Sequence, residues 1–287
     1  MKLLTFYRHE LQRLGVIVED QILDLNEALD NKWTMLDLLD EGKNGFSLVS
    51  EAIESANESN LLSLNEHRIS APIPRTRKNI VCLGLNYAEH VKEGGSNRDL
   101  PPHPVFFTKP TTSITGPYDP VIYNKAVQRL DYEVELAFVI GKEGKYISKE
   151  DALDHIAGYT VFQDISARTL QSQHNQWYRG KSQDTFAPMG PYLVTPDEVG
   201  NPQDLDLWCK VNGETRQKAN SMDMIFDIKT IISTLSDGIT LEVGDVFATG
   251  TPSGVGAAHP KGLLNVGDII ESGVEKVGTL KNKVISE

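Results

Sequence analysis

Residues 131–140, which read Asp-Tyr-Glu-Val-Glu-Leu-Ala-Phe-Val-Ile, constrain the fold of this chain more than any other stretch. Branched and aromatic residues fill the stretch and a glycine follows it, a composition typical of a β-strand. Because successive side chains of a strand point to opposite faces, Asp131, Glu133 and Glu135 should share one face. Carboxylates this close together repel one another unless a hard divalent cation, which prefers oxygen ligands, neutralises them. A half-exposed strand with a solvated acidic face is the alternative, and this stretch alone fits both.

The composition limits the partners that the chain can bind. Its 287 residues include 39% hydrophobic and 24% charged residues, as in ordinary globular proteins. A formal net charge of -12 disfavours nucleic acid and anionic membranes as partners, so an acidic substrate would need a local metal ion, arginine or lysine. The two cysteines, Cys82 and Cys209, fit no metal or redox spacing. No apolar run approaches the roughly 18 residues of a membrane span, and the N-terminus lacks a signal-peptide pattern, so we expect a cytoplasmic protein with no membrane partner.

A proline-rich connector divides the chain into two predicted domains. Residues 1–72 contain three short strands and two short helices without ligand-like spacing, and they predict a small N-terminal α+β domain. The connector, residues 71–75, is stiff because proline fixes φ and removes a backbone donor. We therefore place the boundary between residues 72 and 73. Residues 73–287 form the second domain, and the whole chain is predicted to be mixed α+β and rich in β-strands.

A short helix that carries a possible general base is predicted after residue 86, and two glycines at positions 94 and 95 end it. His90 and Glu93 are i, i+3 neighbours on one face of this helix. The carboxylate can then orient the imidazole, as a general base requires. A surface His–Glu pair is the alternative. Residues 94–103 are rich in glycine, proline and polar groups, and they predict a mobile lid beside the base.

More charged side chains follow the next predicted strand, residues 158–164. The strand delivers Asp164 at its end, and a helix that begins there would place Asp164, Arg168 and Gln171 on one side of its first turns. Lys181 follows among polar and aromatic residues. Arg168 and Lys181 offer the local positive charge that an acidic substrate needs.

A glycine-rich turn at residues 249–256 follows another predicted strand. Backbone amides in such a turn can cradle an anion. The spacing of its glycines does not fit the dinucleotide-binding fingerprint, and no helix follows. A tight turn with no ligand is the alternative.

Five segments in this order resemble the fumarylacetoacetate hydrolase family, in particular its branch of acylpyruvate hydrolases and oxaloacetate decarboxylases. They are residues 84–93, 131–142, 163–168, 180–193 and 249–256. The resemblance spans about residues 75 to 287, and the leading module is similar to the small N-terminal domain of many members. It implies a mixed β-roll catalytic domain, a homodimer, and a bound Mg²⁺ or Mn²⁺ ion.

The resemblance also implies roles for individual residues. Three carboxylates would be the metal ligands: Glu133, Glu135 and Asp164. Three side chains would act in catalysis: His90 and Glu93 as the base dyad on the lid, and Lys181 as a fixed positive charge. Three would bind the substrate: Arg168, Gln171 and Thr251, the last through the substrate carboxylate. Asp131 would be an acid of the strand that is not a ligand. Two departures from the family pattern, Gln163 and Thr169, lie next to the site and bear on the substrate more than on the metal.

The reaction implied by the resemblance passes through an enolate of a 2-oxo or 2,4-dioxo acid that the metal stabilises. With an acylpyruvate, His90 and Glu93 would activate a water for hydrolysis of a C–C bond. With oxaloacetate, loss of CO₂ would give the same enolate without water. Two alternatives stay open: an isomerase or hydratase of the 2-hydroxyhepta-2,4-diene-1,7-dioate isomerase type, and a non-catalytic scaffold.

Overall fold

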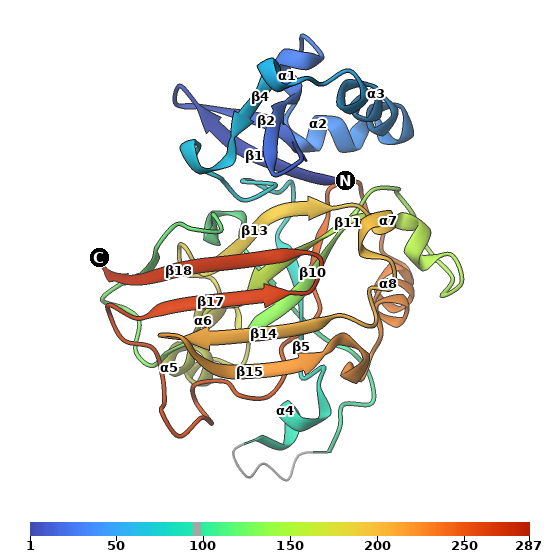
Figure 1. Cartoon of the computed structure of the whole chain (residues 1–287). Helices are drawn as coiled ribbons and strands as arrows, with labels where there is room; N and C mark the ends of the chain where they lie inside the picture. The colour runs from blue at the N-terminus through green and yellow to red at the C-terminus, as the bar shows by residue number, and fades with distance from the viewer. Residues whose placement is uncertain (94–98) are drawn as a thin grey trace.

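Strands dominate the molecule, which the computed structural model describes over residues 1–93 and 99–287 (Figure 1). The predicted β-rich, mixed α+β fold is therefore confirmed. The largest sheet has eleven strands, in the order β4 (Leu61–Ser63), β3 (Gln21–Asp24), β2 (Leu11–Val18), β1 (Lys2–Arg8), β13 (Ala187–Val194), β11 (Ile156–Gln163), β10 (Val134–Ile140), β16 (Val246–Ala248), β5 (Ile80–Gly84) and β6 (Val105–Lys109), with β7 (Ile114–Thr115) attached to β13. A second sheet has the order β15 (Glu214–Asn220), β14 (Asp206–Val211), β17 (Ile269–Val274), β18 (Gly278–Ser286) and β8 (Val121–Tyr123). A third sheet pairs β12 (Ser166–Ala167) with β9 (Leu130–Asp131).

The helices are short. The α-helices described are α1 (Leu25–Ala28), α2 (Met35–Asp40), α3 (Gly42–Glu54), α4 (Ala88–Lys92), α5 (Arg168–Gln173), α6 (Tyr178–Lys181), α7 (Pro196–Val199) and α8 (Ile228–Ser236). Single 3₁₀ turns are η1 (Glu58–Asn60), η2 (Leu64–Glu66), η4 (Thr111–Ser113), η5 (Ala152–His155) and η6 (Ser221–Asp223). No helix in the described ranges is both long and apolar enough to cross a membrane.

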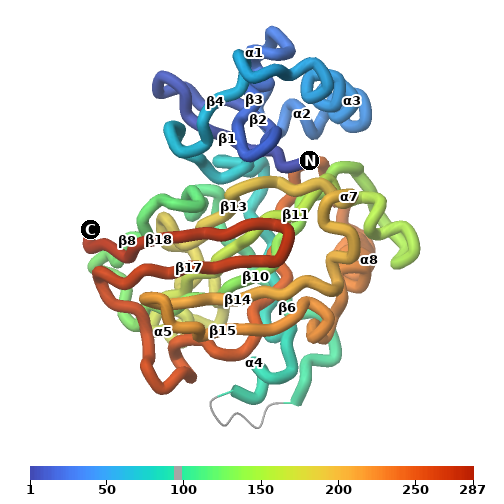
Figure 2. Tube along the Cα trace, viewed as in Figure 1, coloured from blue at the N-terminus to red at the C-terminus, as the bar shows by residue number. Residues whose placement is uncertain are grey.

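The N-terminal module, which contains β1 to β4 and α1 to α3, lies at the top of Figure 1. Its strands continue the large sheet, because Leu3 of β1 pairs antiparallel with Leu193 of β13. Figure 2 shows the N-terminus at this junction. One buried apolar cluster includes Leu3 and Met35 of the module together with Ala137 of β10. Sheet and core both cross the boundary that we place between residues 72 and 73, and the division into two domains stays a prediction.

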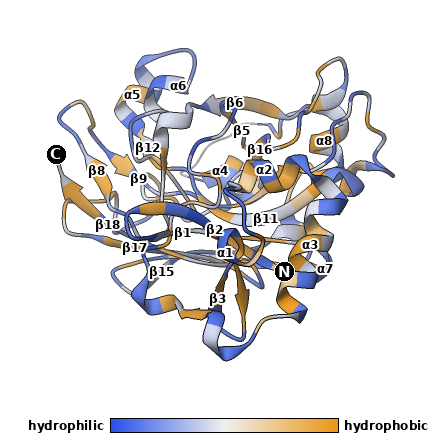
Figure 3. Ribbon diagram, turned by 90° about the horizontal axis from the view of Figure 1, so that it is seen from above, coloured by the Kyte–Doolittle hydropathy of each residue, from blue (hydrophilic) through white to orange (hydrophobic). Residues whose placement is uncertain are grey.

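The two larger sheets pack face to face around β10 and β11. Phe138 and Val161 from these strands share one buried cluster with Leu207 and Leu280 from the five-stranded sheet. Burying both faces of β10 and β11 explains why their sequences are almost continuously apolar. Viewed from above, α5 and α6 lie side by side next to β12 and β9 (Figure 3). This end of the molecule carries the charged side chains described below.

The acidic stretch is not one continuous strand, as the sequence predicts, but two strands with a break at Tyr132 and Glu133. Side chains replace the missing backbone partners there. The Glu133 amide donates to Gln163 Oε1 (2.7 Å), and the Val134 amide donates to Gln217 Oε1 (3.0 Å). These bonds satisfy the buried backbone at the break.

Candidate active site

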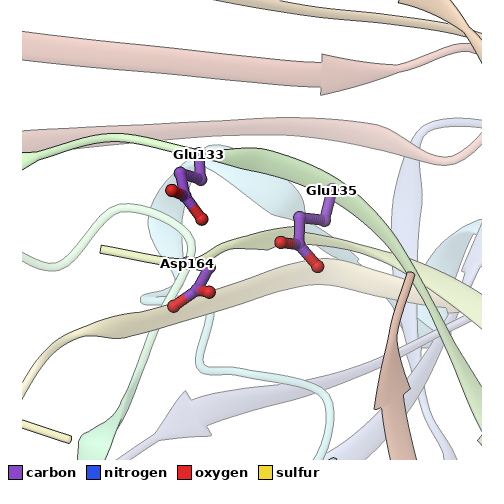
Figure 4. A group of neighbouring side chains, drawn as sticks. All are labelled: Glu133, Glu135 and Asp164. Atoms are coloured by element: carbon purple, nitrogen blue, oxygen red, sulfur yellow. The ribbon is translucent and has the colours of Figure 1, made fainter. Parts of the chain in front are cut away.

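Glu133, Glu135 and Asp164 converge in the interior, each offering an oxygen within 4.8 Å of the others. Figure 4 shows Glu133 and Glu135 extending from one stretch of chain to the side on which Asp164 lies. The register explains the convergence. Val134 pairs with Gln163, and the Asp164 amide donates to Glu133 O (2.8 Å), so the start of β10 and the end of β11 are adjacent. All three carboxylates are buried, with at most 5% of a residue exposed.

Two buried lysines bind this group of carboxylates. Lys181 Nζ lies 2.7 Å from Glu133 Oε2 and 2.6 Å from Asp164 Oδ2. Lys109 Nζ lies 2.5 Å from Asp164 Oδ1. Burial would lower the pKa of Lys181, but Asp164 and Glu133 outweigh it and raise that pKa above its ordinary value. For Lys109, burial dominates the opposing charge of Asp164, and its pKa is lowered.

Lys109 is a residue that our reading of the sequence missed. A signal for it was present in β6, where Phe107 and Lys109 are two residues apart and therefore share the buried face of the strand. A lysine on a buried face needs a carboxylate partner. The partner, Asp164, is 55 residues away in the chain.

Arg168 connects the carboxylates to a neighbouring loop. Its Nε donates to Asp131 Oδ2 (2.8 Å), its Nη2 to Glu133 Oε1 (2.6 Å) and its Nη1 to Gln171 Oε1 (3.0 Å). Burial opposes ionisation of Glu133, but the charges of Lys181 and Arg168 outweigh it and hold the pKa of Glu133 below its ordinary value. Glu133 is therefore an anion in this environment.

Glu135 differs from its two neighbours. Its Oε2 accepts one hydrogen bond, from the amide of Gly250 (2.8 Å), while its Oε1 is buried without a partner among the described residues. Burial, and then the charges of Asp164 and Glu133, raise the pKa of Glu135 well above its ordinary value. A buried oxygen without a donor costs free energy unless a cation satisfies it.

The surroundings of Glu135 fit a hard divalent ion. The three donors are all carboxylate oxygens, the ligands such ions prefer. With every group ionised, the four buried carboxylates of Asp131 and the three converging acids would outnumber the cations of Lys109, Arg168 and Lys181 by one. A proton on Glu135 or a bound cation would remove this excess. A carboxylate has about four lone-pair sites, so the contacts with the lysines leave capacity for a metal ion.

The predicted contact between His90 and Glu93 is present, and their role as a base stays a prediction. His90 Nδ1 lies 2.9 Å from Glu93 Oε2, and the two side chains are 16% and 15% exposed. The amide of Gly254 donates to the other oxygen of Glu93, Oε1 (2.6 Å). This contact fastens the end of α4 to the glycine-rich turn. Residues 94–98, half of the predicted lid, lie outside the described residues.

The glycine-rich turn does not present its amides as the sequence suggests. Four amides of the turn and the residue after it donate to carboxylates of the protein: Gly250 N to Glu135 Oε2 (2.8 Å), Gly254 N to Glu93 Oε1 (2.6 Å), Gly256 N to Asp131 Oδ1 (2.6 Å) and Ala257 N to Asp131 Oδ2 (3.0 Å). The turn thus holds the acids of the site rather than a bound anion. Gly254 has φ +100°, and a Cβ there would lie 2.0 Å from Arg216 O, so the close approach requires glycine.

Thr251 is held within the protein as well. Its Oγ1 donates to Val134 O (2.9 Å) and accepts a hydrogen bond from Gln217 Nε2 (2.8 Å). The residue still lines the cavity described next. Its contact with a substrate carboxylate stays a prediction. A carboxylate only accepts hydrogen bonds, so the hydroxyl would have to redirect the proton that it donates to Val134 O.

A cavity of about 470 Å³ adjoins the carboxylates. Seven of the nine predicted site residues line it: His90, Glu93, Glu133, Arg168, Gln171, Lys181 and Thr251. The other two, Glu135 and Asp164, are buried next to Glu133.

Two aromatic residues that our sequence reading did not assign to the site also line this cavity. The rings of Phe107 and Trp177 meet edge to face at 5.5 Å, and Lys181 Nζ lies 5.1 Å from the centroid of Phe107. A Cβ at Gly84 would lie 2.2 Å from Cζ3 of Trp177, so the indole covers the glycine closely. The cavity is therefore partly apolar, as small-molecule sites usually are.

The chain is similar to known proteins in sequence and in fold. Residues 79–285 match the sequence family described as fumarylacetoacetate (FAA) hydrolase C-terminal. The chain is 42% identical over 300 residues to oxaloacetate tautomerase YisK of Bacillus subtilis, which covers 99% of this chain and 100% of that protein. It is 42% identical over 255 residues to the human mitochondrial oxaloacetate tautomerase FAHD2A, covering 88% of this chain and 80% of that protein.

Solved structures resemble the chain over its whole length. A fumarylacetoacetate hydrolase from Exiguobacterium antarcticum has a TM-score of 0.86 and 36% identity, with 100% of both chains covered. A maleylpyruvate hydrolase from Sphingobium sp. SYK-6, in complex with manganese(II) and pyruvate, has a TM-score of 0.81 and 32% identity, covering 100% of this chain and 99% of that one.

Proposed function

Because this chain belongs to the fumarylacetoacetate hydrolase family and is an enzyme of that family, we propose that it is a divalent-metal-dependent tautomerase of oxaloacetate. Several of its relatives, from a bacterium to mammals, bear this name. The observation that carries the proposal is Oε1 of Glu135, which has no partner in residues 1–93 and 99–287 and is buried beside two more carboxylates, next to a cavity with fixed positive charge.

Glu133, Glu135 and Asp164 would hold the metal ion, Mg²⁺ or Mn²⁺. When bound, such an ion acts as a Lewis acid that withdraws electrons from the 2-oxo group of a substrate. The solved maleylpyruvate hydrolase is in complex with manganese(II) and pyruvate, which supports a divalent ion and a 2-oxo acid as ligands of this chain. The all-oxygen donor set supports either ion.

Tautomerisation moves one proton between C3 and the C2 oxygen of the substrate. Nδ1 of His90 is bound to Glu93, which leaves Nε2 to take the proton as the C3–H bond breaks. Glu93 is held by both His90 and the Gly254 amide, so it fixes the orientation of the imidazole. Lys181, charged and on the cavity wall, stabilises the negative charge that develops on the oxygen before a proton reaches it.

Hydrolysis of a C–C bond is the second candidate reaction. The same dyad, His90 and Glu93, could activate a water molecule, and one structural neighbour is named a maleylpyruvate hydrolase. Tautomerisation is preferred because the relatives named for it are the more similar in sequence, at 42% identity against 32%. Decarboxylation of oxaloacetate would use the same carboxylates and lysine without the dyad.

Enolic oxaloacetate, added to the protein with Mg²⁺ or Mn²⁺, is the substrate for the test. The proposal predicts a faster loss of the ultraviolet absorbance of the enol, stopped by a chelator and restored by the metal. Mass spectrometry should show that the carbon chain stays intact. Prompt formation of pyruvate would identify a decarboxylase instead, and cleavage of acylpyruvates without effect on the enol would identify a hydrolase.

We further propose a cytoplasmic homodimer that binds a small 2-oxo acid. The homodimer rests on the resemblance to the family alone, and the acidic charge of the chain disfavours nucleic acid as a partner. Light scattering of the purified protein would measure its oligomeric state, and a monomer would contradict this part of the proposal.

A further inference from the structure

One cation on the cavity wall has no role in the site described so far. Arg129 lines the cavity and is exposed, so it stands where the cavity meets solvent. Among the described residues, its guanidinium makes no ion pair and no side-chain hydrogen bond. The other two cations of the wall are engaged: Arg168 binds Asp131 and Glu133, and Lys181 binds Glu133 and Asp164.

The backbone holds Arg129 firmly in this place. Its carbonyl accepts a hydrogen bond from the amide of Arg168 (3.0 Å), and the next residue, Leu130, pairs with Ala167. Its φ of 59° lies in the left-handed region, which residues other than glycine, asparagine and aspartate seldom adopt. Local backbone strain of this kind clusters at functional sites. Other residues of this chain, among them Leu85 and Thr185, share this conformation, so the place of Arg129 on the cavity wall carries the argument.

We propose that Arg129 binds the distal carboxylate of a dicarboxylic 2-oxo acid and thereby selects such acids over monocarboxylic ones. This inference rests on the proposed function, which places the first carboxylate and the 2-oxo group at the metal end of the cavity. Oxaloacetate carries a second carboxylate, and desolvating it requires a cation that is not already neutralised. The planar guanidinium matches a carboxylate with two parallel hydrogen bonds.

The test compares two ligands that share the metal-binding end but differ in the distal carboxylate. Oxaloacetate has both ends, and pyruvate has only the first. Dissociation constants for both are measured by calorimetry on the Mg²⁺-loaded protein, alongside KM and kcat for the enol of oxaloacetate. In Arg129→Gln, binding of oxaloacetate should weaken about 10- to 100-fold, as for loss of one hydrogen-bonded charge. Binding of pyruvate should change less than about twofold, because pyruvate has no distal carboxylate and the guanidinium removed in Arg129→Gln lies far from its only carboxylate.

Two control variants separate recognition from other effects. Lys125→Gln removes an exposed cation from the same segment, at a position that does not contribute to the cavity wall, and should leave both dissociation constants unchanged. Arg129→Gly should lose selectivity like Arg129→Gln while its melting temperature stays equal or rises, because glycine adopts the left-handed backbone without strain.

The outcomes also separate this inference from the proposed function. The wild-type protein could bind oxaloacetate more tightly than pyruvate, lose that preference in Arg129→Gln, and yet not tautomerise oxaloacetate. That result would contradict the proposed function and support the role of Arg129. Equal weakening of both ligands in Arg129→Gln, no weakening of either, or the same change in Lys125→Gln would overturn the inference. A lower melting temperature in Arg129→Gly would assign the residue a structural role instead.

Discussion

Two buried carboxylates in this molecule, Asp24 and Glu135, have nearly the same exposure, 2% and 1%, and opposite surroundings. Asp24 caps α1 in the N-terminal module. Its Oδ1 accepts from the amides of Asn26 (3.1 Å) and Glu27 (3.2 Å), and its Oδ2 accepts from Arg8 and Arg13. Both oxygens of Asp24 are satisfied, whereas Oε1 of Glu135 has no partner among the described residues.

The difference teaches how to tell a structural charge from a functional one. A buried charge contributes to stability only when partners replace the water it has lost. The group around Asp24 meets that condition with protein atoms alone. The group around Glu135 meets it with a proton on the carboxylate or with an added cation, and a divalent ion would replace the proton. We therefore expect substitution of Glu135 to lower activity without lowering stability, and substitution of Asp24 to lower stability without lowering activity.

Removing the charge of Glu135 should have the largest effect on activity. In Glu135→Gln, turnover should fall about 1000-fold or more, because the metal contributes several kcal/mol to the transition state and would lose a ligand. Calorimetry should show weakened binding of Mn²⁺. The variant should remain folded and no less stable, since an amide relieves the repulsion from Asp164 and Glu133.

The matched control is Asp24→Asn, an equally buried acid far from the cavity in the chain. Its metal affinity and turnover should stay within about twofold of the wild type. If Asp24→Asn lost metal binding, or if Glu135→Gln kept it, the distinction between a structural and a metal-binding carboxylate would be wrong.

The pair of His90 and Glu93 tests whether a carboxylate with both oxygens hydrogen-bonded always has a structural role only. Both oxygens of Glu93 have partners, His90 and the Gly254 amide, yet the residue lines the cavity. We expect His90→Ala to lower tautomerisation about 100-fold, the lower end of the usual contribution of a general base. Decarboxylation of oxaloacetate, which requires no base, should change far less. Equal losses in the two reactions would remove His90 from the proton transfer.

Removing Asp24 should instead act on stability. Asp24→Asn leaves Arg8 and Arg13 without their shared acid, but these arginines are 28% and 25% exposed and keep contact with water. We therefore expect a loss of about 3 kcal/mol, the lower end for breaking a buried ion pair. Urea unfolding at neutral pH measures it. A loss below about 1 kcal/mol, the value for exposed pairs, would mean that the burial of Asp24 contributes little.

How far the sequence predicts the site depends on how local each contact is. The alternation along residues 131–140 places Glu133 and Glu135 on one face, and the structure agrees. The same alternation groups Asp131 with them; Asp131 shares Arg168 with Glu133 but is not one of the three converging acids. Alternation cannot show the break at Tyr132, where the Val134 amide pairs with the side chain of Gln217, 83 residues away. Glycine spacing shows a turn at 249–256, but it cannot show that the protein's own acids occupy the amides.

The fold shows the same limit. Strand patterns give most elements of the N-terminal module, and prolines predict where the module ends. The pairing of Leu3 with Leu193 joins strands that are about 190 residues apart, and no local propensity encodes which sheet edges meet. A boundary drawn from prolines is therefore compatible with a sheet that continues across it.

The smallest expected effect concerns a carboxylate that is as well paired as Asp24 but exposed. Asp40 accepts two hydrogen bonds from Arg77, and the side chains are 46% and 41% exposed. The hydrogen bond to Arg77 lowers the pKa of Asp40, so any stability it contributes is present at neutral pH and lost as the pH falls through that lowered pKa. Asp40→Asn should cost no more than about 0.5 kcal/mol at pH 7, and the difference from wild type should vanish in acid. Urea unfolding at pH 7 and in acid measures this difference. If Asp40→Asn lowered the free energy of unfolding as much as Asp24→Asn, pairing with arginine, and not burial, would explain the contribution of both carboxylates.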